Sequence, residues 1–415
     1  GLGFLCSLTF YDVETLKHFC LSSHFFHFSI ILIITFITIV QLLRWSSLQI
    51  GDIKAYHPQR VPVLLYATAG LRSLPESDAV SILRASQAAV KEFDYPFLCD
   101  ADMVLVIDGQ KEGLYAWQSA QQMLHLQEKA LSRKVGFVDV GGASTQIGFV
   151  PDAFERHKYG DEIPSVQLHD TRYHVYTHSY LHFGINEAKS RHMNSTIASS
   201  IPRYASSALS SSSSSSASWG AGKNQEKIEV RDPCRLEGHD ETVFRDGKSF
   251  LFIGEGNWDL CLTTLQSMFQ PKVGVYGFAG IEQPSVQDEN TLFIAMDHFS
   301  RVSRFMNVET TIESQIYAEE HIAPLEEWRE KGRLFCRRTL EQGVSDIGDM
   351  FEGYPTSGYC FEAVYIYTLF THGYGFESHT KNIVTNGKVG DWPLTWAMGA
   401  MQSYFEERLR LERIV

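Results

Sequence analysis

From Val61 onward, short apolar runs that end in small-residue turns alternate with longer segments whose apolar positions recur every three or four residues. The first pattern is typical of buried strands and the second of amphipathic helices. Strands are predicted over residues 61–70, 101–109, 134–140, 141–150 and 248–254, and helices over residues 77–93, 114–132, 257–269 and 396–414. Ser77 or Asp78 is placed to cap the first of these helices. Such alternation predicts a layered α/β fold.

The first fifty residues contain one long apolar stretch. Residues 25–43 read FFHFSIILIITFITIVQLL, in which His27 and Gln41 are the only strongly polar members. A helix needs about 20 apolar residues to cross a hydrocarbon core of ~30 Å. We therefore expect an N-terminal segment, residues 1–50, with a single membrane anchor at 25–43. A buried apolar run is the alternative interpretation.

A Ser-rich stretch interrupts the α/β pattern between residues 195 and 227. It includes an unbroken run of serines from Ser210 to Ser216, and such a composition offers little apolar area to bury. We expect a disordered surface insertion within a domain.

Composition and charge exclude several classes of protein. The 36 basic and 49 acidic residues give a net charge of −13, which argues against non-specific binding to nucleic acid. The seven cysteines show neither CxxC nor the spacing of zinc ligands, so a structural zinc site is not predicted. A length of 415 residues is ample for two or three domains.

The segment from Asp139 to Gln146 has the strongest chemical pattern. An acid ends a predicted strand, and the two glycines after it allow backbone N–H groups to turn toward an oxyanion. Ser144 and Gln146 add a hydroxyl and an amide, and Asp139 is suited to holding a divalent cation through water. The first four residues of this segment, Asp-Val-Gly-Gly, are also typical of an ordinary β-hairpin turn.

Two further segments place polar side chains at strand ends. Thr68 and Arg72 lie in a small-residue turn that follows an apolar strand. Glu112 lies between Gly109 and Gly113 at a strand-to-helix junction, where a carboxylate can take a proton from water. The alternative for Thr68 and Arg72 is an ordinary surface turn. The alternative for Glu112 is a carboxylate that only stabilises the first turn of a helix.

Taken together and in this order, the segments resemble the signatures of the apyrase family of nucleoside triphosphate diphosphohydrolases, in particular those of the fungal Golgi apyrases. ATAGLR resembles the second signature, GQKEGLYAW the third, VDVGGASTQIGF the fourth and WAMGAM the fifth, and the likeness covers roughly residues 55–405. The resemblance implies a two-lobed, actin-like (ribonuclease-H-like) architecture with an active-site cleft between the lobes. Residues 51–110 and 388–415 would form an incomplete lobe I, and residues 111–387 lobe II.

The resemblance also implies roles for individual residues. Glu112 would be the general base, with Ser144 and Gln146 positioning the attacking water, and Asp139 would hold Ca²⁺ or Mg²⁺ through water. Thr68, Arg72, Gly141, Gly142 and Ala143 would bind phosphate. The implied enzyme is an apyrase that hydrolyses nucleoside di- and triphosphates to the monophosphate and phosphate, lumenal at the Golgi membrane, where it supports glycosylation.

The chain departs from the family pattern at several positions. The first signature, an Asp-x-Gly-Ser turn, is missing, and residues 1–50 occupy its place. Lys111, Ala116 and Gln121 replace an acid, a glycine and an asparagine of the family pattern. The alternatives are therefore a catalytically impaired nucleotide-binding pseudoenzyme, a truncated apyrase, or an exopolyphosphatase-like phosphatase that shares the glycine turn.

Other residues have structural interpretations in an oxidising lumen. Cys234 with Cys261 and Cys336 with Cys360 are local pairs suited to disulfides, with buried thiols as the alternative. Asn194 begins the only glycosylation sequon. Trp396 is expected to pack an interlobe helix, whereas Phe293, Phe299 and Phe376 are candidates for stacking a nucleobase.

Overall fold

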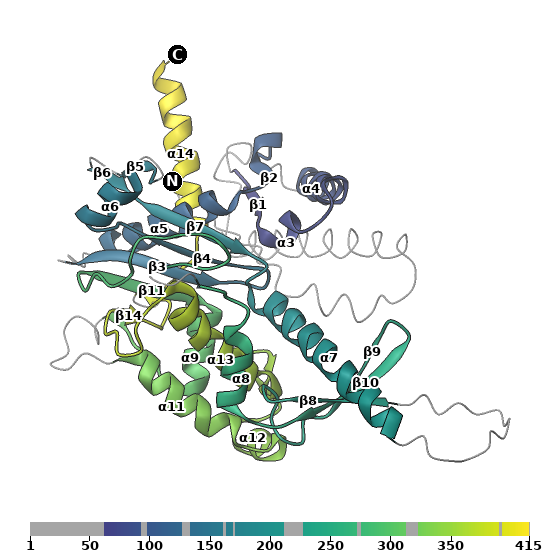
Figure 1. The fold of residues 1–415 in the computed structure, drawn as a ribbon. Coiled ribbons are helices and arrows are strands. Elements are labelled where there is room, and N and C mark those ends of the chain that lie inside the picture. Colours follow the sequence, from purple (N-terminus) through teal and green to yellow (C-terminus); the bar gives the residue numbers. More distant parts are fainter. Residues whose placement is uncertain are drawn as a thin grey trace.

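A five-stranded sheet forms the centre of the computed structural model (Figure 1). The structure describes residues 62–92, 98–126, 133–160, 163–168, 171–210, 227–271, 275–312, 323–389 and 392–414. The strands lie in the order β14 (Ile383–Val384), β11 (Thr291–Asp297), β3 (Lys134–Val140), β4 (Ser144–Phe149) and β7 (Tyr176–Leu181). β14, β11 and β3 are parallel, β4 forms an antiparallel hairpin with β3, and β7 pairs antiparallel with β4. The α/β prediction and the expected ribonuclease-H-like architecture are confirmed.

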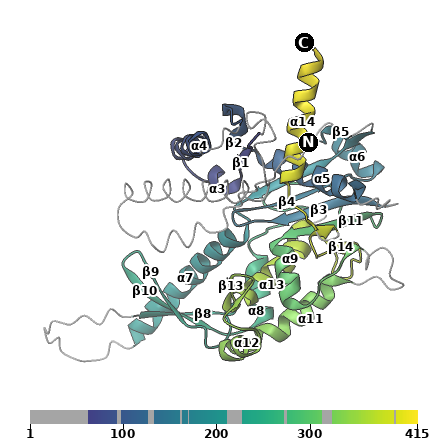
Figure 2. The same cartoon turned by 180° about the vertical axis from the view of Figure 1, so that it is seen from behind.

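The two faces of this sheet bury different cores because side chains alternate along each strand. On β11, Phe293 and Ala295 face one core, whereas Leu292 and Ile294 face the other. The first core is filled by the helices α8 (Trp258–Gln266), α9 (His298–Met306), α11 (Pro324–Cys336) and α13 (Tyr359–Thr368). The second is filled by α5 (Gly109–Leu126) and α14 (Ala397–Ile414), which lie on the opposite side of the sheet (Figure 2).

A smaller unit stands beside the sheet on the side of α5 and α14 (Figure 1). It consists of the parallel pair β1 (Leu65–Ala67) and β2 (Val104–Val106), the short α3 (Ala69–Arg72), α4 (Glu76–Lys91) and a 3₁₀ turn (Ala101–Met103). The prediction that Ser77 or Asp78 caps α4 is wrong. The cap is Pro75, whose carbonyl accepts the first helical hydrogen bonds from Asp78 and Ala79.

The long helix α7 (Ile185–Ser210) runs from the central sheet to a separate sheet of β8 (Lys227–Asp232), β10 (Lys248–Gly254) and β9 (Glu241–Arg245). The expected disorder is wrong for residues 195–210, which continue α7. Met193 and Ile197, one turn apart, pack against Val230 and Phe252 of this sheet, and that burial supports the helix into the Ser-rich segment. Residues 211–226 of the expected insertion lie outside the described part of the chain.

The remaining elements are short, and one of them, the π-helical turn Leu369–Tyr374, is buried in the first core. They are α6 (Ala153–Tyr159), β5 (Ser165–Leu168), β6 (Thr171–His174), α12 (Leu340–Ile347), β12 (Met350–Phe351), β13 (Tyr354–Pro355), the 3₁₀ turn Thr356–Gly358, the π-helical turn Leu369–Tyr374, β15 (Lys388–Val389) and β16 (Trp392–Pro393). The expected anchor at 25–43 also lies outside the described residues. Among the described helices, none has both the length and the apolar character needed to cross a membrane.

Both predicted disulfides are present. Cys234–Cys261 joins the end of β8 to α8, and Cys336–Cys360 joins α11 to α13. All four cysteines are buried in the first core. The bridges therefore tie together the helices that cover one face of the sheet.

Removal of these bridges is expected to lower thermal stability. They link residues 27 and 24 positions apart, and loops of this size contribute about 3 kcal/mol each when closed. Replacing Cys336 and Cys360 together with Ala should lower Tm by roughly 5–10 °C in a differential scanning experiment. The control is Cys99→Ala, which removes a buried free thiol and should cost much less. An unchanged Tm in the double variant would show that the bridge contributes nothing.

Candidate active site

The glycine turn between β3 and β4 forms one wall of the site. A hydrogen bond of 3.0 Å from the Gly141 amide to the Ser144 carbonyl closes the turn. The amides of Gly142 and Ala143 find no acceptor in the part of the chain that the structure describes. Adjacent N–H groups of this kind form an anion-binding nest. The turn thus has two donors available for a phosphate.

The N-terminus of α7 fixes the direction of these donors. The amides of Ile185 and Asn186 donate to the carbonyls of Gly141 and Gly142, at 2.9 and 3.0 Å. The C=O and N–H of a trans peptide point in opposite directions, so the Gly142 and Ala143 amides point away from α7. Gly184 permits this contact, because a Cβ on it would lie 2.3 Å from the Ala143 nitrogen.

Arg72 connects the small unit to this turn. Its Nη2 lies 2.8 Å from Glu112 Oε2 and 3.4 Å from Ser144 Oγ. Gln146 Nε2 donates to Ser144 Oγ at 2.6 Å and to Ser179 Oγ at 3.0 Å. The structure therefore brings Arg72, Glu112, Ser144 and Gln146 into one hydrogen-bonded group.

Thr68 and Gly109 position the two segments that carry Arg72 and Glu112. The Thr68 carbonyl accepts from the Leu71 and Arg72 amides at 3.1 and 3.2 Å, which forms the turn that carries Arg72. Thr68 makes no side-chain cap. Gly109 starts α5 close to β7, since a Cβ there would lie 2.3 Å from Ser179 Cβ.

Glu112 lies in the first turn of α5 and is 6% exposed. Burial raises the pKa of its carboxyl group, and the charge and hydrogen bond of Arg72 act in the opposite direction. A carboxylate whose pKa is raised toward neutral is a stronger base and still ionises when a cation is beside it.

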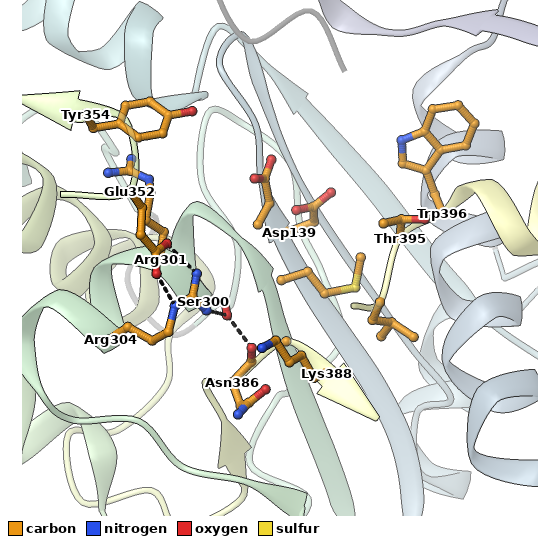
Figure 3. Close-up of a pocket in the computed structure, with 14 residues that line it drawn as sticks. Asp139, Ser300, Arg301, Arg304, Glu352, Tyr354, Asn386, Lys388, Thr395 and Trp396 are labelled. Atoms are coloured by element: carbon orange, nitrogen blue, oxygen red, sulfur yellow. Dashed lines mark hydrogen bonds and ion pairs between the residues drawn. The ribbon is translucent and has the colours of Figure 1, made fainter. Parts of the chain in front are cut away.

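Asp139 ends β3 and lines a cavity of about 400 Å³ (Figure 3). It is 8% exposed, and its Oδ1 has no hydrogen-bond partner among the described residues. Burial raises the pKa of Asp139 well above the ordinary value, and the charges of Asp297 and Glu112 raise it further. A bound divalent cation reverses this repulsion and supplies the missing partner, so the residues present fit such an ion.

The expectation that Phe293, Phe299 and Phe376 stack a nucleobase is not supported. All three are at most 2% exposed, and Phe293 and Phe376 pack edge to face inside the first core. Their apolar neighbours exclude a ligand. Trp396 packs in the second core as expected and also lines the cavity beside Asp139.

Sequence reasoning missed Ser179 and Asp297. Ser179 pairs in register with Gln146 across β4 and β7, a relation that only the strand pairing reveals. Asp297 ends β11 as Asp139 ends β3, and an acid that closes an apolar run was the available signal.

The model of the GDA1/CD39 (nucleoside phosphatase) family matches residues 41–414. The chain is 28% identical over 371 residues to ectonucleoside triphosphate diphosphohydrolase 5 of Bos taurus, which covers 88% of this chain and 73% of that protein. It is 28% identical over 377 residues to ectonucleoside triphosphate diphosphohydrolase 3 of Mus musculus, covering 82% of this chain and only 63% of the mouse protein.

A solved structure is similar in fold. The crystal structure of nucleoside triphosphate hydrolases from Neospora caninum matches with a TM-score of 0.54 at 15% identity, covering 85% of this chain and 73% of that one. At this identity the likeness concerns the fold alone.

The position of Gly184 generates a prediction about the turn. Gly184→Ala should push the Gly142–Ala143 peptide away from α7, because the new methyl group would overlap it. We expect a lower Tm and weaker binding of vanadate, a phosphate analogue, measured by calorimetry. The matched control is Gly343→Ala, where a Cβ would meet only ordinary contacts at 3.5 Å or more. Wild-type vanadate affinity in a folded Gly184→Ala variant would contradict the assigned role of the turn.

Proposed function

Since the chain belongs to the GDA1/CD39 (nucleoside phosphatase) family, we propose that it hydrolyses nucleoside di- and triphosphates to the monophosphate and inorganic phosphate. The family supports hydrolysis of nucleotide phosphoanhydrides and is in general dependent on divalent cations. The observation that carries the proposal is the group of Glu112, Arg72, Ser144 and Gln146 beside a turn with two available amides.

In the proposed mechanism the terminal phosphoryl group binds to the Gly142 and Ala143 amides. Its oxygens compete with Glu112 for Arg72, since a guanidinium binds phosphate as well as carboxylate. Glu112, freed of part of this contact, accepts a proton from a water molecule that attacks phosphorus directly. Ser144 and Gln146 hold that water by hydrogen bonds. The bond between phosphorus and the bridging oxygen breaks, so that inorganic phosphate forms and the nucleotide shortened by one phosphate leaves. Positioning and electrostatics provide most of the rate enhancement in such a reaction.

Asp139 is the residue proposed to hold Ca²⁺ or Mg²⁺ through water. When bound, the cation neutralises charge on the phosphate oxygens. Cation binding would also stabilise the fold, because Asp139 Oδ1 is buried with no hydrogen-bond partner among the described residues and would gain one.

We further propose a location in the Golgi lumen, at the membrane, where hydrolysis of nucleoside diphosphates would support glycosylation. Two observations support an oxidising lumen. Both disulfides lie in buried positions, and disulfides persist in such compartments. Asn194 of the sequon is exposed on α7. Membrane attachment by residues 25–43 stays part of this proposal.

A direct test is the release of phosphate from UDP, GDP and ATP with Ca²⁺ or Mg²⁺. Glu112→Gln removes the base without changing its shape, and we expect kcat to fall about 10²–10⁴-fold. Glu327→Gln, on the exposed face of α11, is the control and should behave as wild type. Nucleotide binding without release by the folded wild-type chain would instead identify the pseudoenzyme. Release from polyphosphate in preference to nucleotides would identify the exopolyphosphatase-like alternative.

The pKa of Glu112 generates a second prediction, for Arg72→Gln. Loss of the guanidinium removes the charge and the hydrogen bond that lower the pKa of Glu112, so this pKa should rise. A general base acts in its ionised form, and the acid limb of the kcat/KM profile, which reports the free enzyme, should therefore move to higher pH. Arg231→Gln, which removes an exposed pair with Glu255, is the control. An acid limb at the wild-type pH in an active Arg72→Gln variant would show that another group is the base.

A further inference from the structure

Asp297 occupies an unusual backbone position at the end of β11. Its φ is 55°, in the left-handed region that few side chains other than glycine adopt. The residue joins β11 directly to α9, which begins at His298. The chain therefore changes direction at an acidic residue.

Strand pairing explains what this backbone conformation achieves. Met296 pairs with Asp139 across the parallel strands, and Asp297 pairs with Val140. Side chains alternate along a strand, so a regular continuation would direct Asp297 to the face of Val140, which is the first hydrophobic core. The turn at Asp297 removes its carboxylate from that core.

Asp297 and Asp139 instead line the same cavity. They are close enough that the charge of Asp297 contributes, after burial, the largest electrostatic effect on Asp139. The Asp139 side chain is more than nine-tenths buried, faces the cavity and has an oxygen, Oδ1, without a hydrogen-bond partner among the described residues. Two close carboxylates with an unsatisfied buried oxygen are costly unless a cation lies between them.

Both arginines that line this cavity are paired with other carboxylates, although the buried Nη1 of Arg301 has no hydrogen-bond partner among the described residues. Arg301 Nη2 lies 2.7 Å from Glu362 Oε2, and Arg304 makes two hydrogen bonds to Glu352, at 2.8 and 2.7 Å. Figure 3 places these arginines on the wall opposite Trp396, with Asp139 between the two walls. Lys388, the other cation that lines the cavity, is exposed.

We propose that Asp139 and Asp297 together bind one divalent cation that prefers oxygen ligands. The binding site lies entirely on the ends of β3 and β11, so it needs no acid from the missing Asp-x-Gly-Ser turn. The use of this cation in hydrolysis rests on the proposed function, but its binding does not. Oxygen-rich sites of this kind select Ca²⁺, Mg²⁺ or Mn²⁺.

The test measures binding of Mn²⁺ alone to the full chain, without nucleotide, by electron paramagnetic resonance. Wild type should bind one Mn²⁺, in competition with Ca²⁺. Asp297→Asn and Asp139→Asn should each weaken binding about 10–100-fold. Asp349→Asn, an exposed acid on the same lobe, is the control and should bind as wild type.

Thermal unfolding provides a second readout that does not depend on hydrolysis. Mn²⁺ should raise the Tm of wild type and of Asp349→Asn, but much less that of Asp297→Asn. Without metal, Asp297→Asn should be at least as stable as wild type, because a repulsion is removed. This outcome also excludes misfolding as the cause of weak binding.

Two results would overturn the proposal. One is wild-type Mn²⁺ affinity in Asp297→Asn, and the other is the absence of Mn²⁺ binding by folded wild type. If Mn²⁺ binds as expected and no nucleotide is hydrolysed, the proposed function fails and the cation site stands.

Discussion

The ion pair between Arg72 and Glu112 is the interaction on which the site depends. A carboxylate that is almost fully buried loses its charge unless a cation lies beside it. Arg72 comes from α3 and Glu112 from α5, so their contact of 2.8 Å fixes the small unit against the helix that covers the central sheet. Ser144 extends the same group to the glycine turn. One buried charge thus links three segments that are distant in sequence.

The second constraint is the direction of the peptide groups in the glycine turn. The first amides of α7 donate hydrogen bonds to the carbonyls of Gly141 and Gly142. The amides of Gly142 and Ala143 therefore point away from α7. Glycine is required at position 184 because the backbone of α7 must lie against the turn. The direction of these two amides is therefore a consequence of how a helix packs on a hairpin, and not of the turn sequence alone.

Much of this fold follows from local sequence patterns, and the site follows from them only in part. The predicted strands that became β3 and β4 are short apolar runs, and the sheet buries almost every residue of both. β11 has the same continuous burial but was not among the predicted strands. The start of α4 was mispredicted because Ser77 and Asp78 are typical capping residues. The helix instead begins directly after Pro75, whose carbonyl accepts its first hydrogen bonds. The helical residues 195–210 depended on distant contacts with β8 and β10, which composition cannot reveal.

The site residues also divide into those that the local sequence indicates and those that only the folded structure reveals. Glu112 and Asp139 are each conspicuous beside glycines, whereas Ser179 is visible only through its register with Gln146. Asp297 closes an apolar run, but its position beside Asp139 follows only from the strand pairing and the backbone turn. Phe293 and Phe376 were wrongly expected to stack a nucleobase, because both belong to a core that the sheet shares with four helices.

The most direct test of this account is a crystal structure of the chain with Mg²⁺ and a non-hydrolysable nucleoside triphosphate analogue. The account predicts the terminal phosphate on the Gly142 and Ala143 amides, Arg72 in contact with its oxygens, and a water molecule between Glu112 and phosphorus. A nucleotide bound away from this turn, with the Arg72–Glu112 pair unchanged, would contradict it.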